Sequence, residues 1–166
     1  MKKRIEHRID IAADQFYEKV YFDEAFNAKL YADLGFRERR VLKLEDRGDV
    51  VYREILQVPE RDLPGPVKKV MGGEQLAYTE KGTWHKKTGR VEIEIVSSVK
   101  PDKSKSKGIF SIEPDGPSAC KRVFDFEVKV DIFAIGGMIE KVIMDDVVKG
   151  YDRSAEFTNR WLREHR

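Results

Sequence analysis

The chain contains a single cysteine, Cys120, among its 166 residues. One thiol cannot form a disulfide within the chain, and it cannot supply the paired thiolates of a zinc knuckle. Long apolar runs are also missing, because no stretch approaches the roughly 18 residues that a membrane-spanning helix needs. Charged residues follow Met1-Lys2-Lys3-Arg4 where a secretory signal would have its apolar segment. We therefore expect a cytoplasmic protein.

Sequence motifs that carry chemistry are missing too. The three histidines, His7, His85 and His165, lie far apart, and none forms a His/Glu pair at metal-ligand spacing. Gly136-Gly137 lacks the pattern of a phosphate-binding loop, and no nucleophile motif occurs. The charge is nearly balanced, at +2, which does not favour a nucleic-acid partner. We expect no metal and no cofactor, and a zinc or nucleotide enzyme is disfavoured.

The strongest pattern lies at the end of the chain, between Gly136 and Arg166. Apolar residues recur there at helical spacing, which predicts one long helix with a single apolar face. They are Ile135, Ile139, Val142, Ile143, Val147, Tyr151, Phe157 and Trp161. A helix of this length with one wet side must lie across a wide apolar surface.

The preceding chain can supply that surface as a sheet. Ile5 to Ile11 alternates as a half-buried strand; a helix then starts at Ala12-Ala13-Asp14 with Asp14 as its cap, and a second helix spans about Asp23 to Leu34. From Phe36 the period changes to two, which predicts six strands joined as a meander. Their expected bounds are Phe36–Glu45, Val50–Val58, Gln75–His85, Arg90–Val99, Ile109–Glu113 and Ala119–Ile132. A short helix is expected within Pro59–Glu74.

This element order predicts an α+β fold for residues 1–166 as one domain. A curved, seven-stranded antiparallel sheet wraps around the long C-terminal helix, and the two short helices after the first strand close one end.

The order of elements resembles the helix-grip fold of the START-like, or SRPBCC, superfamily. Two segments carry the resemblance: the opening strand into Ile11-Ala12-Ala13-Asp14-Gln15-Phe16-Tyr17, and the ending from Ile135-Gly136-Gly137-Met138 through Tyr151-Asp152-Arg153 to Trp161-Leu162. The superfamily includes steroidogenic lipid-transfer domains and the birch-pollen allergen type, and the chain is most similar to an uncharacterised bacterial branch. The resemblance implies a deep cavity for an apolar ligand between helix and sheet. It assigns no catalytic residue.

Charged residues in the inward phase of these elements are candidate ligand contacts. His7, Glu80, Arg122 and Asp146 each share a face with apolar residues, as does Arg40 with Leu42. Such a polar patch could orient a ligand, or it could be an internal network without a ligand. Asp146 in particular could pair with an arginine. The remaining predicted contacts are Ile9, Tyr78, Trp84, Ile93, Ile95, Phe124, Phe126, Val128, Ile139, Ile143 and Val147. Gly150 could leave room for a ligand, or for Trp84 or Phe126.

Loop parity predicts the entrance of the cavity. In a meander alternate connections meet at one end, so Pro59–Glu74, the basic loop Lys100–Gly108 and the Ile132–Gly137 connection should be neighbours. The expected entrance residues are Leu63, Val67, Val70, Met71, Phe133 and Ile135. Apolar groups surrounded by lysines suit an anionic membrane surface, and the lysines expected at this end are Lys68, Lys69, Lys100, Lys103, Lys105 and Lys107. The alternative is an ordinary solvated loop.

Two functions remain open, beside a third, weaker option of a regulatory module that senses a ligand or binds a protein through the sheet. One is a monomeric carrier that binds a lipid, a sterol-like or another large apolar molecule and exchanges it at the inner face of a membrane. The other is an enzyme of the cyclase or aromatase type, with His7, Glu80 and Asp146 as acid/base groups on an apolar or polyketide substrate. The lack of a catalytic motif favours the carrier.

Overall fold

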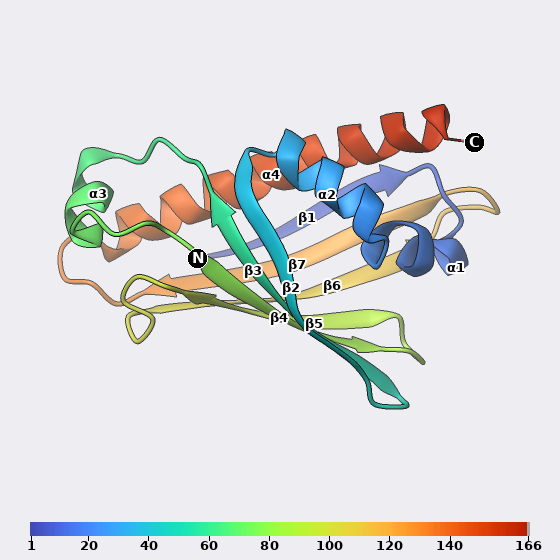
Figure 1. The fold of residues 1–166 in the computed structure, drawn as a ribbon, viewed down its shortest axis with the longest axis horizontal. Helices are drawn as coiled ribbons and strands as arrows, with labels where there is room; N and C mark the ends of the chain where they lie inside the picture. Colours follow the sequence, from blue (N-terminus) through green and yellow to red (C-terminus); the bar gives the residue numbers. More distant parts are fainter. Residues whose placement is uncertain (166) are drawn as a thin grey trace.

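In the computed structural model, which describes residues 1–165, one antiparallel sheet of seven strands curves around a long helix (Figure 1). The strand order is β1-β7-β6-β5-β4-β3-β2, so β2 to β7 form a meander and β1 pairs with β7. The strands are β1 (Lys2–Ile9), β2 (Phe36–Asp46), β3 (Val50–Pro59), β4 (Tyr78–His85), β5 (Arg90–Ser97), β6 (Ser104–Pro114) and β7 (Cys120–Val130). The predicted helix-grip architecture is confirmed.

The long helix α4 (Gly136–Glu164) covers the concave face of the sheet and packs closest to β7 and β1. Its inward face buries Ile139, Met144, Ala155 and Thr158. The helix starts at a glycine because the backbone is crowded there. A Cβ on Gly136 would lie 2.3 Å from the carbonyl oxygen of Val130. The stripe in the sequence therefore predicted the correct covering element; Arg166, the predicted last residue, lies outside the described residues.

Three short helical segments follow β1 and close one end of the sheet: α1 (Ala13–Phe16), a π-helical turn η1 (Tyr17–Tyr21) and α2 (Glu24–Asp33). The Asp23 carboxylate caps α2 by accepting a hydrogen bond from the Phe26 amide at 2.8 Å. The cap predicted at Asp14 is wrong. Ala12 occupies the N-cap position of α1, and Asp14 lies in the first turn. The carboxylate of Asp14 is there stabilised by the positive end of the helix dipole.

The prediction of a basic loop over Lys100–Gly108 is wrong for the second half of that segment. Strand β6 already begins at Ser104, so Lys105 and Lys107 lie on a strand opposite Lys129 and Glu127 of β7. The Lys107 ammonium lies 3.8 Å from the Glu127 carboxylate. Serine or glycine alternates with lysine in this segment, which is a period-two strand pattern. The low complexity of the segment led to the loop prediction instead.

Strand β2 does not keep a simple alternation either. Its pairing with β3 shifts register between Phe36 and Glu38 and again between Val41 and Lys43. Each irregularity reverses which side chains point inward. Arg40 therefore faces solvent, 63 % exposed, and the predicted place of Arg40 in an inner polar patch is wrong. Arg39 takes the buried position.

The third helix α3 (Gly65–Met71) lies beyond β3 at the opposite end from α1 and α2 (Figure 1). The Ser98–Lys103 connection and the β7–α4 connection lie at the same end, as parity predicted. Among the described residues, no helix is both long enough and apolar enough to cross a bilayer.

Candidate ligand-binding cavity

A cavity of about 530 Å³ lies between α4 and the concave face of the sheet. This volume is within the range of small-molecule sites in proteins. The sheet contributes Ile93, Ile95, Phe110, Phe124 and Phe126 to its wall, and the helix contributes Ile139, Ile143 and Val147. These side chains face one another because strands with period two and a helix with one apolar stripe enclose the space from two sides.

Helix α3 and its flanking loops form one end of the cavity. Leu63, Val67, Val70 and Met71 all line it, as does Lys100. The helix follows Pro64-Gly65-Pro66 and ends at Gly72, which has a positive φ of 61°. Gly72 and Gly73 make this boundary sharp because only glycine adopts such angles at little cost. An apolar helix therefore lines this end of the cavity, and proline and glycine residues interrupt regular structure on both sides of it.

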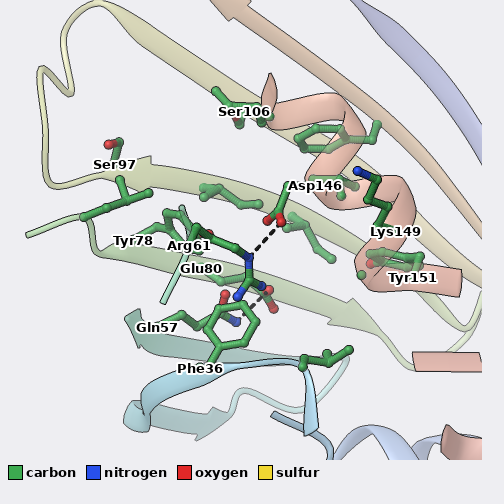
Figure 2. Close-up of a pocket in the computed structure, with 18 of the residues that line it drawn as sticks. Phe36, Gln57, Arg61, Tyr78, Glu80, Ser97, Ser106, Asp146, Lys149 and Tyr151 are labelled. Atoms are coloured by element: carbon green, nitrogen blue, oxygen red, sulfur yellow. Dashed lines mark hydrogen bonds and ion pairs between the residues drawn. The ribbon is translucent and has the colours of Figure 1, made fainter. Parts of the chain in front are cut away.

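Polar side chains interrupt the apolar wall at its middle (Figure 2). The Gln57 amide lies 3.3 Å from the Glu80 carboxylate and 3.2 Å from the Tyr31 hydroxyl, and we call these three residues the polar cluster. Tyr78 from β4 and Tyr151 from α4 also line this part of the cavity. A ligand here would meet hydrogen-bonding groups as well as rings.

An ion pair connects the loop after β3 to α4 beside this cluster. The Arg61 guanidinium lies 2.7 Å from the Asp146 carboxylate and donates to the Gly35 carbonyl oxygen at 2.9 Å (Figure 2). Its guanidinium also lies 4.9 Å above the Phe36 ring. Asp146 therefore lines the cavity and also pairs with an arginine. Pairing with an arginine is one of the two alternatives predicted for it.

Two buried arginines lie deeper in the wall. Arg53 donates to the Tyr21 carbonyl oxygen at 2.8 Å. Arg122 donates to the Ser154 hydroxyl at 2.9 Å and to the Tyr151 carbonyl oxygen at 2.8 Å. Burial lowers the pKa of the Arg122 guanidinium, because the charged form loses hydration. These contacts tie α4 and η1 to the sheet around the cavity.

The phenols that face the cavity stay protonated at neutral pH. Burial raises the pKa of Tyr31 and of Tyr151, and the nearby negative charge of Glu80 raises both further. Burial also raises the pKa of Tyr78, with the charge of Asp146 as a second cause. Each of these hydroxyls can therefore act as a hydrogen-bond donor.

Most of the predicted ligand-contact residues line the cavity, and some do not. Those that do are Tyr78, Glu80, Ile93, Ile95, Arg122, Phe124, Phe126, Ile139, Ile143, Asp146 and Val147, and at the entrance Leu63, Val67, Val70 and Met71. Ile9 and Val128 are packed in the solid core, fully buried. Trp84 stacks on Tyr17 at a centroid distance of 4.8 Å, on the inward face but beyond the cavity.

His7 is outside the cavity as well. Its Nε2 lies 2.8 Å from the Asp152 carboxylate and its Nδ1 lies 3.3 Å from an Arg122 nitrogen. Of the predicted entrance residues, Ile135 precedes α4 and packs on the core. Phe133 is 98 % exposed to solvent rather than turned into the entrance.

Sequence reasoning missed several cavity residues. Arg53 and Gln57 share the inward phase of β3 with Ile55, so the same test that selected Glu80 could have found them. Tyr31 and Arg61 had no such signal, because their positions depend on how α2 and the loop after β3 pack. Gly150 lines the cavity, and a Cβ there would meet nothing within 4 Å. The space beside it is open, not filled by Trp84 or Phe126.

Comparisons with known proteins identify the family of the chain. The sequence profile of a family described as "Protein of unknown function (DUF2505)" matches residues 4–162. No curated protein matches the sequence.

Several solved structures share the architecture. A START superfamily protein from Mycobacterium smegmatis has 15% sequence identity and a TM-score of 0.54, over 93% of this chain and 97% of that chain. The Zhui aromatase/cyclase from Streptomyces sp. R1128 has 14% identity and a TM-score of 0.64, over 98% and 96%. Norcoclaurine synthase from Thalictrum flavum, solved with dopamine and hydroxybenzaldehyde, has 18% identity and a TM-score of 0.61, over 100% and 89%. The chain therefore has the START-like helix-grip fold.

Proposed function

We propose that this chain, which belongs to the DUF2505 family, binds an apolar small molecule inside the fold and carries it. The observation that supports this most is the cavity of about 530 Å³ with mainly apolar walls from Ile93, Phe124, Phe126 and Ile143. Protein interiors are otherwise packed at nearly the density of organic crystals. A space of this size at the centre of the fold costs stability, and a bound apolar molecule would recover the lost contacts.

The first test asks whether the cavity holds a ligand. The protein is purified without detergent and measured by native mass spectrometry, and its organic extract is analysed for lipids and other apolar molecules. We expect bound species that disappear on denaturation. In parallel, the neutral dye Nile red should bind with one site per chain and gain fluorescence. A chain that carries no extractable molecule and fails to bind Nile red would contradict the proposal.

The alternative, an enzyme of the cyclase or aromatase type, loses support from the arrangement of its predicted acid/base groups. His7 is outside the cavity, hydrogen-bonded to Asp152, and Asp146 is paired with Arg61 at 2.7 Å. Glu80 alone of the three faces the cavity without an ion-pair partner within 4 Å among the described residues. The likeness to an aromatase/cyclase is at 14% identity, which supports the fold and not the reaction.

For the exchange step, we propose that the end with α3 docks on an anionic membrane. Lys100 and Lys103 lie in the connection at this end, and Phe133 is the large apolar side chain that stands free beside the cavity entrance. Lysines near an anionic surface contribute about 1 kcal/mol each, and an aromatic ring can enter the headgroup layer. This combination supports loose and reversible binding, which a carrier needs.

A matched pair of double variants tests the docking model. Lys100→Ser with Lys103→Ser removes charge from the entrance end, whereas Lys105→Ser with Lys107→Ser removes the same charge from the outer face of β6. Co-sedimentation with vesicles of anionic and of neutral phospholipid gives the readout. We expect the first pair to weaken binding to anionic vesicles by about thirtyfold, and Phe133→Ser to weaken it further, with a small effect of the second pair. Equal losses for both pairs would mean that only net charge matters, and the docking model would be wrong.

A further inference from the structure

The Glu80 carboxylate lacks a strong partner at the middle of the cavity. Among residues 1–165 no arginine, lysine or histidine lies within ion-pair distance of it, and its one hydrogen bond is the 3.3 Å contact from the Gln57 amide. That amide is shared with the Tyr31 hydroxyl. A carboxylate has about four acceptor sites, so most of its capacity is unused. Figure 2 shows Glu80 among the side chains that line the cavity.

Nearby cations are held by other groups. The Arg39 guanidinium lies 2.6 Å from the Glu24 carboxylate, and Arg61 lies 2.7 Å from Asp146. Arg53, which pairs with Gly82 in the β3–β4 ladder, two residues from Glu80, donates to the Tyr21 carbonyl oxygen. Glu80 is half-buried and lines the cavity, so its unused acceptor capacity is available to a donor that enters the cavity.

The surroundings select among possible head groups. A carboxylate on the ligand would meet the like charges of Glu80 and Asp146, and the Arg61 guanidinium beside them is already paired with Asp146. An ammonium would be attracted to Glu80, but it would have to lose more hydration than a neutral group, and Arg53 and Arg61 already place positive charge in the same cavity wall. A neutral hydroxyl brings a donor without a charge and needs little dehydration. Rings flank the place where it would sit, because Tyr31, Tyr78 and Phe36 line the same part of the cavity.

We propose that Glu80 is the specificity-determining residue of the cavity, and that it selects apolar molecules bearing a hydroxyl group, as alcohols or phenols do. The inference rests on the proposed function, since it requires that the cavity binds an apolar molecule. The ligand hydroxyl donates to a carboxylate oxygen of Glu80, and its apolar body lies between the wall of the sheet and α4. Fatty-acid-like anions are the disfavoured class.

A set of biphenyls with different head groups tests the selection by displacement of Nile red. The probes are 4-phenylphenol, its methyl ether 4-methoxybiphenyl, 4-phenylbenzylamine and biphenyl-4-carboxylate. The phenol and its ether differ in one donor. Since a hydrogen bond to a charged group is worth about 1.5–3 kcal/mol, we expect the phenol to bind about tenfold or more tightly than the ether. The carboxylate should bind most weakly.

The isosteric change Glu80→Gln removes the charge and keeps the shape. It should bring the affinities of phenol and ether within about threefold and strengthen binding of the carboxylate. Glu94→Gln, on the exposed side of β5, is the matched control and should leave all four affinities unchanged. Circular dichroism checks that both variants fold, and the comparison of probes on the unmodified chain does not depend on either variant.

The outcomes separate the two proposals. If Nile red binds but the phenol and its ether compete equally, Glu80 does not select a hydroxyl, while the carrier function stands. If the amine binds most tightly and Glu80→Gln removes that preference, the site selects cations and the hydroxyl proposal is overturned. If Nile red does not bind at all, the proposed function itself fails, and this inference fails with it.

Discussion

Gly150 offers the sharpest perturbation of the cavity, since its two possible roles predict opposite effects. It lies on the inner face of α4, lines the cavity, and has no atom within 4 Å of where a Cβ would stand. Gly150→Leu would place an apolar side chain in that open space. Glycine inside a helix costs about 1 kcal/mol relative to the best helix formers. The variant should therefore be more stable than the original chain by about 1 kcal/mol.

The same change should weaken ligand binding. A leucine and a ligand cannot occupy the same space, and forcing extra methylenes into a packed site typically costs about 1–3 kcal/mol. This corresponds to a loss of about tenfold or more in affinity. The assay pairs thermal unfolding with Nile red titration, and a gain of 1 kcal/mol should raise Tm by about 2–4 °C for a chain of this size.

A matched control exists in the same helix. Gly137 is exposed in the first turn of α4, with nothing within 4 Å of a Cβ. Gly137→Leu should leave affinity unchanged, because it points away from the cavity. If Gly150→Leu destabilises the chain, then the space beside Gly150 is not open. If it stabilises the chain but binds Nile red as tightly as before, the dye binds elsewhere and the cavity is not the ligand site.

Two further predictions follow from single contacts. Phe126→Ala truncates a ring that is 2 % exposed and lines the cavity, so it should lower the free energy of unfolding by about 3–5 kcal/mol and also change the uptake of Nile red. Denaturant unfolding and Nile red titration measure the two effects. A loss of stability under about 1 kcal/mol would mean that the ring is not packed as described. The backbone amide of Val130 donates to the Glu140 carboxylate at 2.9 Å and lowers its pKa below the ordinary 4.5, helped by the N-terminal ammonium. That stabilisation is present above the unfolded-state pKa and is lost as the pH falls through the lower folded-state pKa. Glu140→Gln should thus destabilise the chain at pH 7 and cost little at pH 3, and an equal cost at both pH values would refute the linkage.

The sequence alone determined the architecture, because period and element order are local properties of the chain. The stripe from Ile139 to Trp161 could only be a helix with one apolar face, and the alternation through β7 could only be a strand with one buried face. Seven strands with that helix leave one economical arrangement, in which the helix covers the sheet. Loop parity then placed the Pro59–Glu74 segment, the basic segment that starts at Lys100 and the Ile132–Gly137 connection at one end without any coordinates.

The cavity and its polar groups depended on tertiary structure. Inward phase predicted that Glu80, Arg122 and Asp146 would face inward, but not that Asp146 would find Arg61 from a loop 85 residues away. Because of the bulges in β2, Arg39 is buried and Arg40 is exposed, the reverse of the prediction. A bulge is difficult to recognise from the sequence. Strand phase likewise put His7 and Trp84 on the inner face, but the position of each along the strand decided that neither reaches the cavity. A pattern fixes the side of an element that a residue occupies, whereas the distance between two elements depends on the packing of the whole chain.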